Sequence, residues 1–151
     1  MRFSSHRLPA TVLYRSSKEV SEEMTTVAEA MSAKLVTMAS GSSLAEAASV
    51  MSQAGVGSVL IMEGDRLDGI LTERDIVRAI SHDIGAPRDE IAHWMSAGPQ
   101  TIDANAGLEE ARDVMDRAHI RHLPVTEGGK LVGILSMRDL VRVGAAAARD
   151  L

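Results

Sequence analysis

The sequence repeats itself once. Residues Val27–Ile80 align with residues Ile91–Gly144 at a constant offset of 64 residues, without a gap. Of the 54 aligned pairs, 21 are identical, and the tripeptides Met31–Ala33 and Gly69–Leu71 both recur unchanged. A repeat of fixed period indicates a copied supersecondary unit that is too small to bury its apolar face alone. We therefore expect two units of matching shape that bury their exposed sheet faces against each other.

Each copy contains the signals of two helices. In the first copy Leu44, Ala47, Ala48 and Met51 recur at the spacing of one helix face, and Leu108, Ala111 and Met115 repeat that stripe in the second copy. Ser43 and Glu46 predict a capping box at the start of this helix, and Gly55 predicts a left-handed residue at its end. A further helix is expected at the end of each copy, over Glu73–Ile80 and Met137–Gly144.

The remaining apolar runs in each copy are short and predict strands. A first strand precedes the first helix, and a hairpin with a Gly-containing turn follows that helix. In the first copy the strands are expected at Leu35–Met38, Ser58–Met62 and Leu67–Leu71, and in the second at Gln100–Ile102, His122–Thr126 and Leu131–Leu135. The order strand, helix, strand, strand, helix indicates the α/β (α+β) class, with two small mixed sheets flanked by helices.

The repeat also divides the chain. We expect an N-terminal extension over residues 1–23, a first unit over 24–83, a linker over 84–90 and a second unit over 91–151. The linker lies in a region rich in charges that contains Gly85 and Pro87, both typical of breaks between elements. The extension has no counterpart in the repeat.

Composition excludes several classes of function. The chain has no Cys, which rules out disulfides, thiol catalysis and thiolate metal sites. No apolar run is long enough for a membrane span or a signal peptide, so we expect a soluble cytoplasmic protein. The net charge is −5 and the basic residues are scattered, which makes nucleic acid an unlikely partner. No P-loop, dinucleotide fingerprint, nucleophile–base set or metal constellation is present, so we expect no catalytic residues and no enzyme activity.

A shared motif ends each hairpin, Gly69–Asp75 in the first copy and Gly133–Asp139 in the second. It places a hydroxyl (Thr72 or Ser136) at a strand end and a carboxylate (Asp75 or Asp139) three residues later, in the first turn of a helix. Helix N-termini suit phosphate, a carboxylate accepts from ribose hydroxyls, and the glycines would let a ligand approach the backbone. The same spacing is also a helix-capping signature, and spacing alone favours that interpretation.

The two copies differ just before the hairpin. The second has His119, Ile120, Arg121 and His122 where the first has Gly55–Ser58. Arg121 and His122 are candidates for contact with phosphate, which predicts two unequal sites and one nucleotide per chain. The alternative is that these side chains lie on a solvated edge. Two histidines without further ligands do not make a zinc site, so no metal is expected.

Taken together, these motifs resemble those of a cystathionine beta-synthase (CBS) domain pair. The resemblance covers most of Val27–Val143 and rests on five groups of residues: Met31-Ser32 with Met95-Ser96, Ser43–Ala48, Gly55–Ser58, Arg121–Val125, and the two Gly-Ile-Leu-(Thr/Ser)-x-Arg-Asp motifs. It implies two units stacked about a pseudo-two-fold axis. It also implies a cleft that binds an adenosine-containing ligand: AMP, ADP, ATP, S-adenosylmethionine or a dinucleotide such as NAD.

The resemblance also implies which residues meet that ligand. The hydroxyl and acid of each motif would contact phosphate and ribose, the threonines of the first strands would line the adenine pocket, and Pro124 would shape its strand by withholding an N–H. Ordinary strand preference explains the threonines equally well. The candidate ligand-binding residues are Thr37, Thr72, Asp75, Thr101, Arg121, His122, Pro124, Ser136, Arg138 and Asp139.

The resemblance finally implies a regulatory role. Such pairs sense a ligand and pass a conformational change to another domain or, as expected here, to a separate protein partner. Homodimers are common, and the apolar stripes of the last helices, with Ile76, Ile80, Leu140 and Val143, are candidates for that contact. The alternative is a module that dimerises or acts as a scaffold without any ligand.

Overall fold

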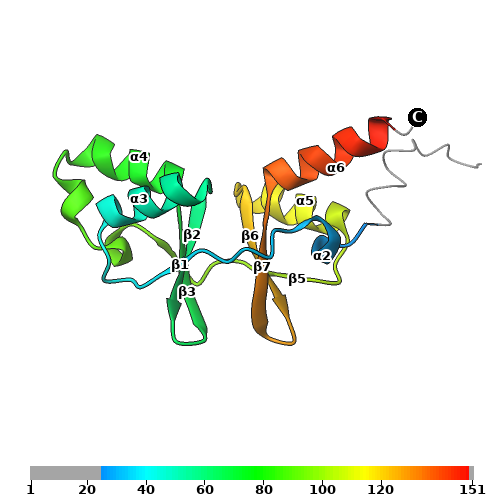
Figure 1. Cartoon of the computed structure of the whole chain (residues 1–151), viewed down its shortest axis with the longest axis horizontal. Helices are drawn as coiled ribbons and strands as arrows, with labels where there is room; N and C mark the ends of the chain where they lie inside the picture. The colour runs from blue at the N-terminus through cyan, green and yellow to red at the C-terminus, as the bar shows by residue number, and fades with distance from the viewer. Residues whose placement is uncertain (1–24, 150–151) are drawn as a thin grey trace, which may run out of the picture.

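The computed structural model describes residues 25–149 and shows two similar halves side by side (Figure 1). The expectation of an N-terminal extension over residues 1–23 lies outside the described residues. We call the half that contains β1–α4 unit 1 and the half that contains β5–α6 unit 2. The elements of unit 1 are β1 (Thr37–Met38), α3 (Leu44–Ala54), β2 (Ser58–Glu63), β3 (Arg66–Thr72) and α4 (Glu73–His82). Those of unit 2 are β5 (Ile102–Asp103), α5 (Leu108–Ala118), β6 (His122–Glu127), β7 (Lys130–Ser136) and α6 (Met137–Arg149).

The predicted class and element order are confirmed, and the strand bounds shift. Each unit is a small mixed sheet with its helices packed on it: β1 runs parallel to β2 and β5 parallel to β6, whereas both hairpins are antiparallel. The first strands were predicted too long. In each of them only two residues form pairs with the neighbouring hairpin strand. The hairpin strands were predicted too short. Their turns hold only two residues, so pairing continues to Glu63 with Arg66 and to Glu127 with Lys130.

Four short elements were not predicted: α2 (Val27–Ala30), the 3₁₀ turns η1 (Ala86–Arg88) and η2 (Ile91–His93), and β4 (Ser96–Ala97). Two of them cross between the units. β4 completes the sheet of unit 1, in the order β1-β2-β3-β4, whereas α2 packs on α6 and β7 of unit 2. The exchange is symmetric, since Ser32 forms a bridge with Ile134 of unit 2 and its repeat equivalent Ser96 pairs with Ile70 of unit 1. The packed units are therefore not continuous in sequence.

Gly69 and Gly133 have a different role from the one expected. A Cβ on Gly69 would lie 2.6 Å from Met95 Sδ and 3.0 Å from the carbonyl oxygen of Ser96. A Cβ on Gly133 would lie against Met31 Sδ and 2.8 Å from the carbonyl oxygen of Ser32. Both glycines thus admit the exchanged segments at a distance that no side chain would allow. The expectation that they leave room for a ligand is wrong.

Each unit has its own apolar core, and each core includes one crossing segment. Val27 and Ala30 of α2 join Leu108, Leu123 and Leu135 in the core of unit 2. The repeat equivalent of Val27 is Ile91 in η2, which is fully buried in the core of unit 1. Burial of one such side chain stabilises a fold by about 1.5–3 kcal/mol. Each crossing segment therefore ties one end of its own repeat copy to the opposite unit.

The predicted helix signals are confirmed in unit 1 and modified in unit 2. Ser43 and Glu46 form the expected capping box, and Gly55 ends α3 in the left-handed region with φ +66°. The equivalent end of α5 is His119, which also has a positive φ, +53°. A non-glycine residue pays a steric cost there, because its Cβ approaches the following carbonyl oxygen. Unit 2 thus keeps the left-handed backbone conformation at this position, although glycine, the residue that suits it, is replaced by His119.

Candidate functional site

The two hydroxyl–acid motifs lie at the N-termini of α4 and α6, the ends of these helices that lie toward the middle of the molecule (Figure 1). We call this region, where unit 1 faces unit 2, the seam. In unit 1 the Thr72 N–H and hydroxyl donate to Asp75 Oδ2 at 2.9 and 3.0 Å, and the Asp75 N–H donates to Thr72 Oγ1 at 3.3 Å. Arg78 donates to the other oxygen of Asp75 at 3.2 Å. Asp75 is buried, with 7% of its surface exposed.

Unit 2 repeats this geometry. The Ser136 N–H and hydroxyl donate to Asp139 Oδ2 at 2.8 and 2.9 Å, and Arg142 bridges Asp139 and the carbonyl oxygen of Ala30, each at 3.2 Å. The capping interpretation therefore describes both motifs in this structure. A carboxylate offers about four acceptor positions, so each acid retains capacity for another donor. Contact of Thr72, Asp75, Ser136 and Asp139 with a ligand remains a prediction.

Groups of both units meet around Gly57. A Cβ placed on Gly57 would lie 3.5 Å from Glu73 Oε2 of unit 1 and 3.5 Å from His122 Nε2 of unit 2. Burial lowers the pKa of His122 below its usual value, and the positive charges of Arg138 and Arg121 act in the same direction. The negative charges of Glu73 and Asp139 oppose the shift. The half-buried imidazole thus lies at the seam between charges of both signs, and its burial favours the neutral form.

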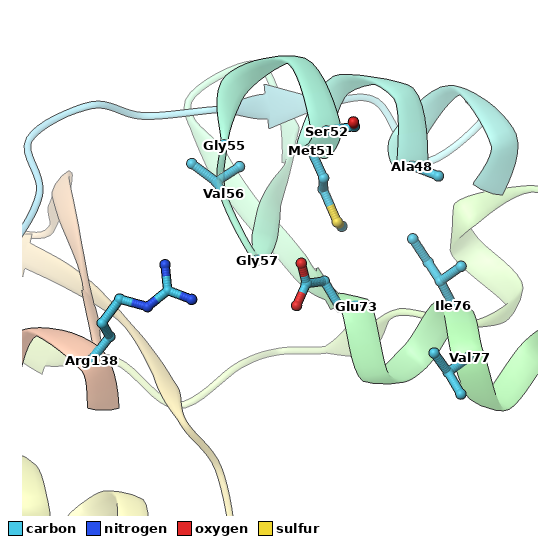
Figure 2. A pocket seen from close by; sticks show the side chains of 10 residues that line it. All are labelled: Ala48, Met51, Ser52, Gly55, Val56, Gly57, Glu73, Ile76, Val77 and Arg138. Carbon is cyan, nitrogen blue, oxygen red and sulfur yellow. The ribbon is translucent and has the colours of Figure 1, made fainter.

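A pocket of about 410 Å³ opens at this point, and we call it the seam pocket. Its walls come from the C-terminal part of α3, the segment Gly55–Gly57 that precedes β2, and the first turns of α4. Figure 2 shows the Arg138 guanidinium of unit 2 on the side opposite Ile76, with the Glu73 carboxylate between them. Its volume lies in the range of small-molecule sites. It is lined by Ala48, Met51, Ser52, Gly55, Val56, Gly57, Glu73, Ile76, Val77 and Arg138.

Of the ten predicted binding residues, all of which the structure describes, Arg138 alone lines the seam pocket. His122 lies beside it. Thr37 and Thr101 are exposed, Thr101 precedes β5 instead of lying in it, and Pro124 is buried in β6. Sequence reasoning missed Glu73, whereas Gly57 belongs to the segment Gly55–Ser58 that was singled out as different between the copies. A signal for Glu73 existed as well, because it differs in type from its repeat equivalent Met137.

The matching positions of unit 2 hold larger side chains. Arg112, His119 and Arg121 replace the small residues that line the seam pocket. Met137 replaces the acid Glu73. The two halves of the seam are therefore unequal in shape and in charge, although their backbones match. The expectation of one nucleotide per chain stays a prediction.

Pro124 introduces a second inequality. In unit 1 the Leu60 N–H donates to the carbonyl oxygen of Val36 at 2.9 Å. Pro124 is the repeat equivalent of Leu60 and has no N–H, so the equivalent carbonyl, that of Gln100, cannot receive this bond. Gln100 lines a second pocket of about 310 Å³, together with Val114, Arg117 and Ala118. In unit 2 the Gln100 carbonyl oxygen thus lacks this strand partner, whereas in unit 1 the equivalent carbonyl oxygen of Val36 is used for strand pairing.

Residues 25–149 lack two kinds of feature. No three His, Asp or Glu side chains of this range are grouped so as to hold a metal ion. None of the helices described in it combines the length and the apolar character that a membrane crossing requires.

Comparisons with known proteins agree on one family. The family model for the CBS domain matches residues 27–82 and again residues 89–146. The CBS domain-containing protein YhcV of Bacillus subtilis is 32% identical over 117 residues, which cover 78% of this chain and 84% of YhcV. A CBS-domain protein from Burkholderia ambifaria has a solved structure with a TM-score of 0.76 and 31% identity, over 81% of this chain and 95% of that one. At fold level the chain also matches the CBS domain pair of protein MJ0100, solved in complex with 5′-methylthioadenosine and S-adenosyl-L-methionine. That match has a TM-score of 0.73 and 24% identity, over 81% of this chain and 97% of that one.

Proposed function

Because the chain belongs to the CBS domain family, as a tandem pair, we propose that it is a regulatory module that binds an adenosine-containing ligand between its two units. The candidate ligands are AMP, ADP, ATP, S-adenosylmethionine and an NAD-type dinucleotide. Ligand binding changes the relation between the units, and a separate protein partner responds to that change. We place this function in the cytoplasm and propose no catalytic step.

The observation that carries the proposal is the convergence of both units on the seam pocket. Arg138 reaches it from unit 2, and Glu73 and the apolar residues Met51, Val56 and Ile76 line it from unit 1. An arginine is suited to a phosphate or carboxylate, and apolar walls are suited to a base. A ligand held there touches both units at once, which gives it a means of changing their relative position.

Two further groups match parts of an adenosine ligand. The Gln100 carbonyl, which Pro124 leaves without its strand partner, belongs to a residue of the second pocket and suits the exocyclic amine of an adenine bound there. The spare acceptor positions of Asp75 and Asp139 suit ribose hydroxyls. The MJ0100 domain pair was solved with two adenosine compounds, which makes S-adenosylmethionine and 5′-methylthioadenosine obvious members of a test panel.

Thermal unfolding with a panel of adenosine compounds tests the proposal. A ligand at one hundred times its Kd adds about 2.7 kcal/mol to the free energy of unfolding and raises Tm by several degrees. Guanosine and uridine nucleotides serve as controls. If none of the adenosine compounds raises Tm more than these controls do, the proposal fails.

Asp139 separates ligand contact from capping. If Asp139 contacts the ligand, Asp139→Ala lowers the affinity at least ten-fold beyond any effect on folding. If it acts as a cap only, the variant lowers the free energy of unfolding by about 1 kcal/mol and leaves affinity unchanged. The same change at Asp75 is the matched comparison in unit 1. Calorimetry then gives the stoichiometry, for which we expect one ligand per chain.

The alternative function is a dimerisation module that needs no ligand. The observation in its favour is the exposure of Val77 and Val141 on the outer surfaces of α4 and α6. We propose a homodimer through these helices under either function. One expected contact residue is excluded, because Leu140 is buried in the core of unit 2. A dimer whose Tm no adenosine compound changes would favour this alternative.

A further inference from the structure

One arginine of unit 2 links an acid of the seam to α2. Arg142 Nη2 donates to Asp139 Oδ1 and to the carbonyl oxygen of Ala30, each at 3.2 Å. Ala30 is the last residue of α2, so its carbonyl oxygen has no partner within this single-turn helix. Figure 1 shows α2 on the side of unit 2, although it belongs to the first repeat copy. A single guanidinium thus contacts both a candidate ligand-binding acid and a segment from the other copy.

Arg78 repeats this arrangement in unit 1. Its Nη2 donates to Asp75 Oδ1 at 3.2 Å and to the carbonyl oxygen of Trp94 at 3.4 Å. Trp94 ends η2 and is the repeat equivalent of Ala30. An ion pair between an arginine and an acid one turn earlier contributes little when the arginine is more than half exposed, as both of these arginines are. The contact that distinguishes them from ordinary surface ion pairs is therefore the one with the carbonyl oxygen of the crossing segment.

The crossing segments depend on docking to the opposite unit. α2 is a single turn, and such a short helix is not stable in water by itself. In each segment the first two backbone N–H groups donate to carbonyl oxygens of the unit on which the segment packs: Val27 to Ala106 at 2.8 Å, Ala28 to Ala104 at 2.9 Å, Ile91 to Ser42 at 2.8 Å and Ala92 to Ser40 at 3.0 Å. These four N–H groups, which we call the reporters, exchange with solvent when their segment opens away from that unit. Their exchange rates therefore measure the docking of each segment separately.

We propose that Arg78 and Arg142 are positioning residues, each of which couples the acid of its unit to the crossing segment docked there. The acid keeps the guanidinium turned toward the segment, and a docked segment in turn holds the guanidinium against the acid. A ligand whose ribose hydroxyls donate to Asp139 fixes the carboxylate that holds Arg142, and so strengthens the docking of α2. By the reciprocity of linked equilibria, a docked α2 strengthens the binding of that ligand. The ligand part of this inference rests on the proposed function, whereas the coupling of acid and segment needs no ligand.

Hydrogen exchange of the reporters, measured by NMR on the ligand-free chain, tests the coupling. Arg142→Gln should speed the exchange of Val27 and Ala28 about five-fold, the effect of one exposed hydrogen bond, and leave the two reporters of η2 unchanged. Arg78→Gln is the matched variant and should give the opposite pattern. A general loss of stability speeds all four reporters alike. Equal acceleration of both pairs therefore overturns the proposal, and so does the absence of any change.

A double-mutant cycle tests the route through the acid. Asp139→Asn removes the charge that holds Arg142, and it should speed the two reporters of α2 about as much as Arg142→Gln does. In the combined variant the two effects should not add, because both changes remove the same link. Additive effects overturn the route through Asp139.

AMP, ATP and S-adenosylmethionine then test the ligand part. A compound that raises Tm should slow the α2 reporters of the parent chain and should bind Arg142→Gln about five-fold more weakly, the factor that reciprocity requires. Equal affinity for the parent and the variant overturns the coupling to the ligand. If none of these compounds raises Tm, the proposed function fails, whereas the exchange pattern of the ligand-free chain still decides whether the arginines couple acid and segment.

Discussion

Unit 1 and unit 2 have similar backbone conformations and differ in the side chains at equivalent positions. Both have the same order of their three repeated strands, the same acid-capped helix start and the same glycine against a crossing segment, although only the sheet of unit 1 gains a fourth strand. They differ at the end of the first helix and at the start of the hairpin, where Gly55 and Gly57 correspond to His119 and Arg121. The shared positions maintain packing between the copies. Some of the positions that differ line the seam pocket, where a ligand or a partner would bind.

The largest expected effect on stability concerns the apolar cores of the two units. Leu71 and Leu135 are repeat equivalents, and both are fully buried. Leu71→Ala and Leu135→Ala should each lower the free energy of unfolding by about 2–5 kcal/mol, through lost burial and the cavity that remains. Because the crossing segments tie the units together, we expect one cooperative transition in urea for each variant. Two separate transitions would mean that the units fold independently.

Somewhat smaller effects are expected at the crossing points. Gly69→Ala and Gly133→Ala should each cost about 1–3 kcal/mol, because the new methyl group meets a methionine sulfur and a backbone oxygen of the exchanged segment. Gly133→Ala should cost more, since its backbone contact is the shorter one. Gly41→Ala is the control, as a Cβ there meets nothing within 4 Å. Equal stability of all three variants, measured by urea denaturation, would contradict this account.

A matched pair of substitutions examines the end of the first helix. His119→Gly should raise the free energy of unfolding by about 1 kcal/mol, because glycine has no Cβ to strain at φ +53°. Gly55→Ala should lower it by a similar amount at φ +66°. The signs are opposite although both changes are made at the same backbone position of the repeat. A loss of stability in His119→Gly would show that the imidazole makes a contact worth more than the strain.

The smallest effect is a pH dependence confined to unit 2. Burial lowers the pKa of His122 in the folded chain below its unfolded value, so the unfolded chain binds the proton more readily. The stability is therefore highest above the unfolded pKa near 6.5 and falls as the pH drops from there toward the lower folded pKa. His122→Ser, which installs the residue that unit 1 has at Ser58, should flatten the profile between pH 7.5 and pH 5. Identical profiles for the variant and the parent would remove His122 from the explanation.

The sequence was sufficient for the parts of the fold that depend on local signals. Helical spacing, the capping box of Ser43 and Glu46 and the position of Gly55 predicted α3, and short apolar runs around a Gly-containing turn predicted both hairpins. The crossing segments escaped prediction because their pairing is not local: the stability of β4 depends on an edge of β3 that lies about thirty residues earlier in the chain. Gly69 and Gly133 were singled out from the sequence, but the space beside them was assigned to a ligand. No sequence pattern shows which backbone segment approaches these glycines.

The candidate site was predicted in part for the same reason. The N-cap motifs and the unusual His119–His122 segment could be read from the repeat, and they do lie at the seam. The seam pocket itself depends on side chains of both units, and its walls are mostly the small or apolar residues that a search for reactive groups passes over. Comparison of the two copies singled out Gly55–Ser58, and the same comparison extended to the start of α4 would have identified Glu73, since residues that differ between equivalent positions carry information that shared residues do not.

The exchange of α2 and β4 has a consequence for the order in which the protein is made. A ribosome delivers residues 27–80 first, yet at that point Val27 and Ala30 lack the unit 2 core on which they pack, and the β3 edge lacks β4. Domains made at about 5–20 residues per second usually fold as they emerge. Here the opening helix α2 must wait for unit 2, because it is buried only once residues up to Leu140 have left the tunnel. During those seconds a nascent chain exposes an apolar stretch and an open strand edge, which are the features that chaperones bind.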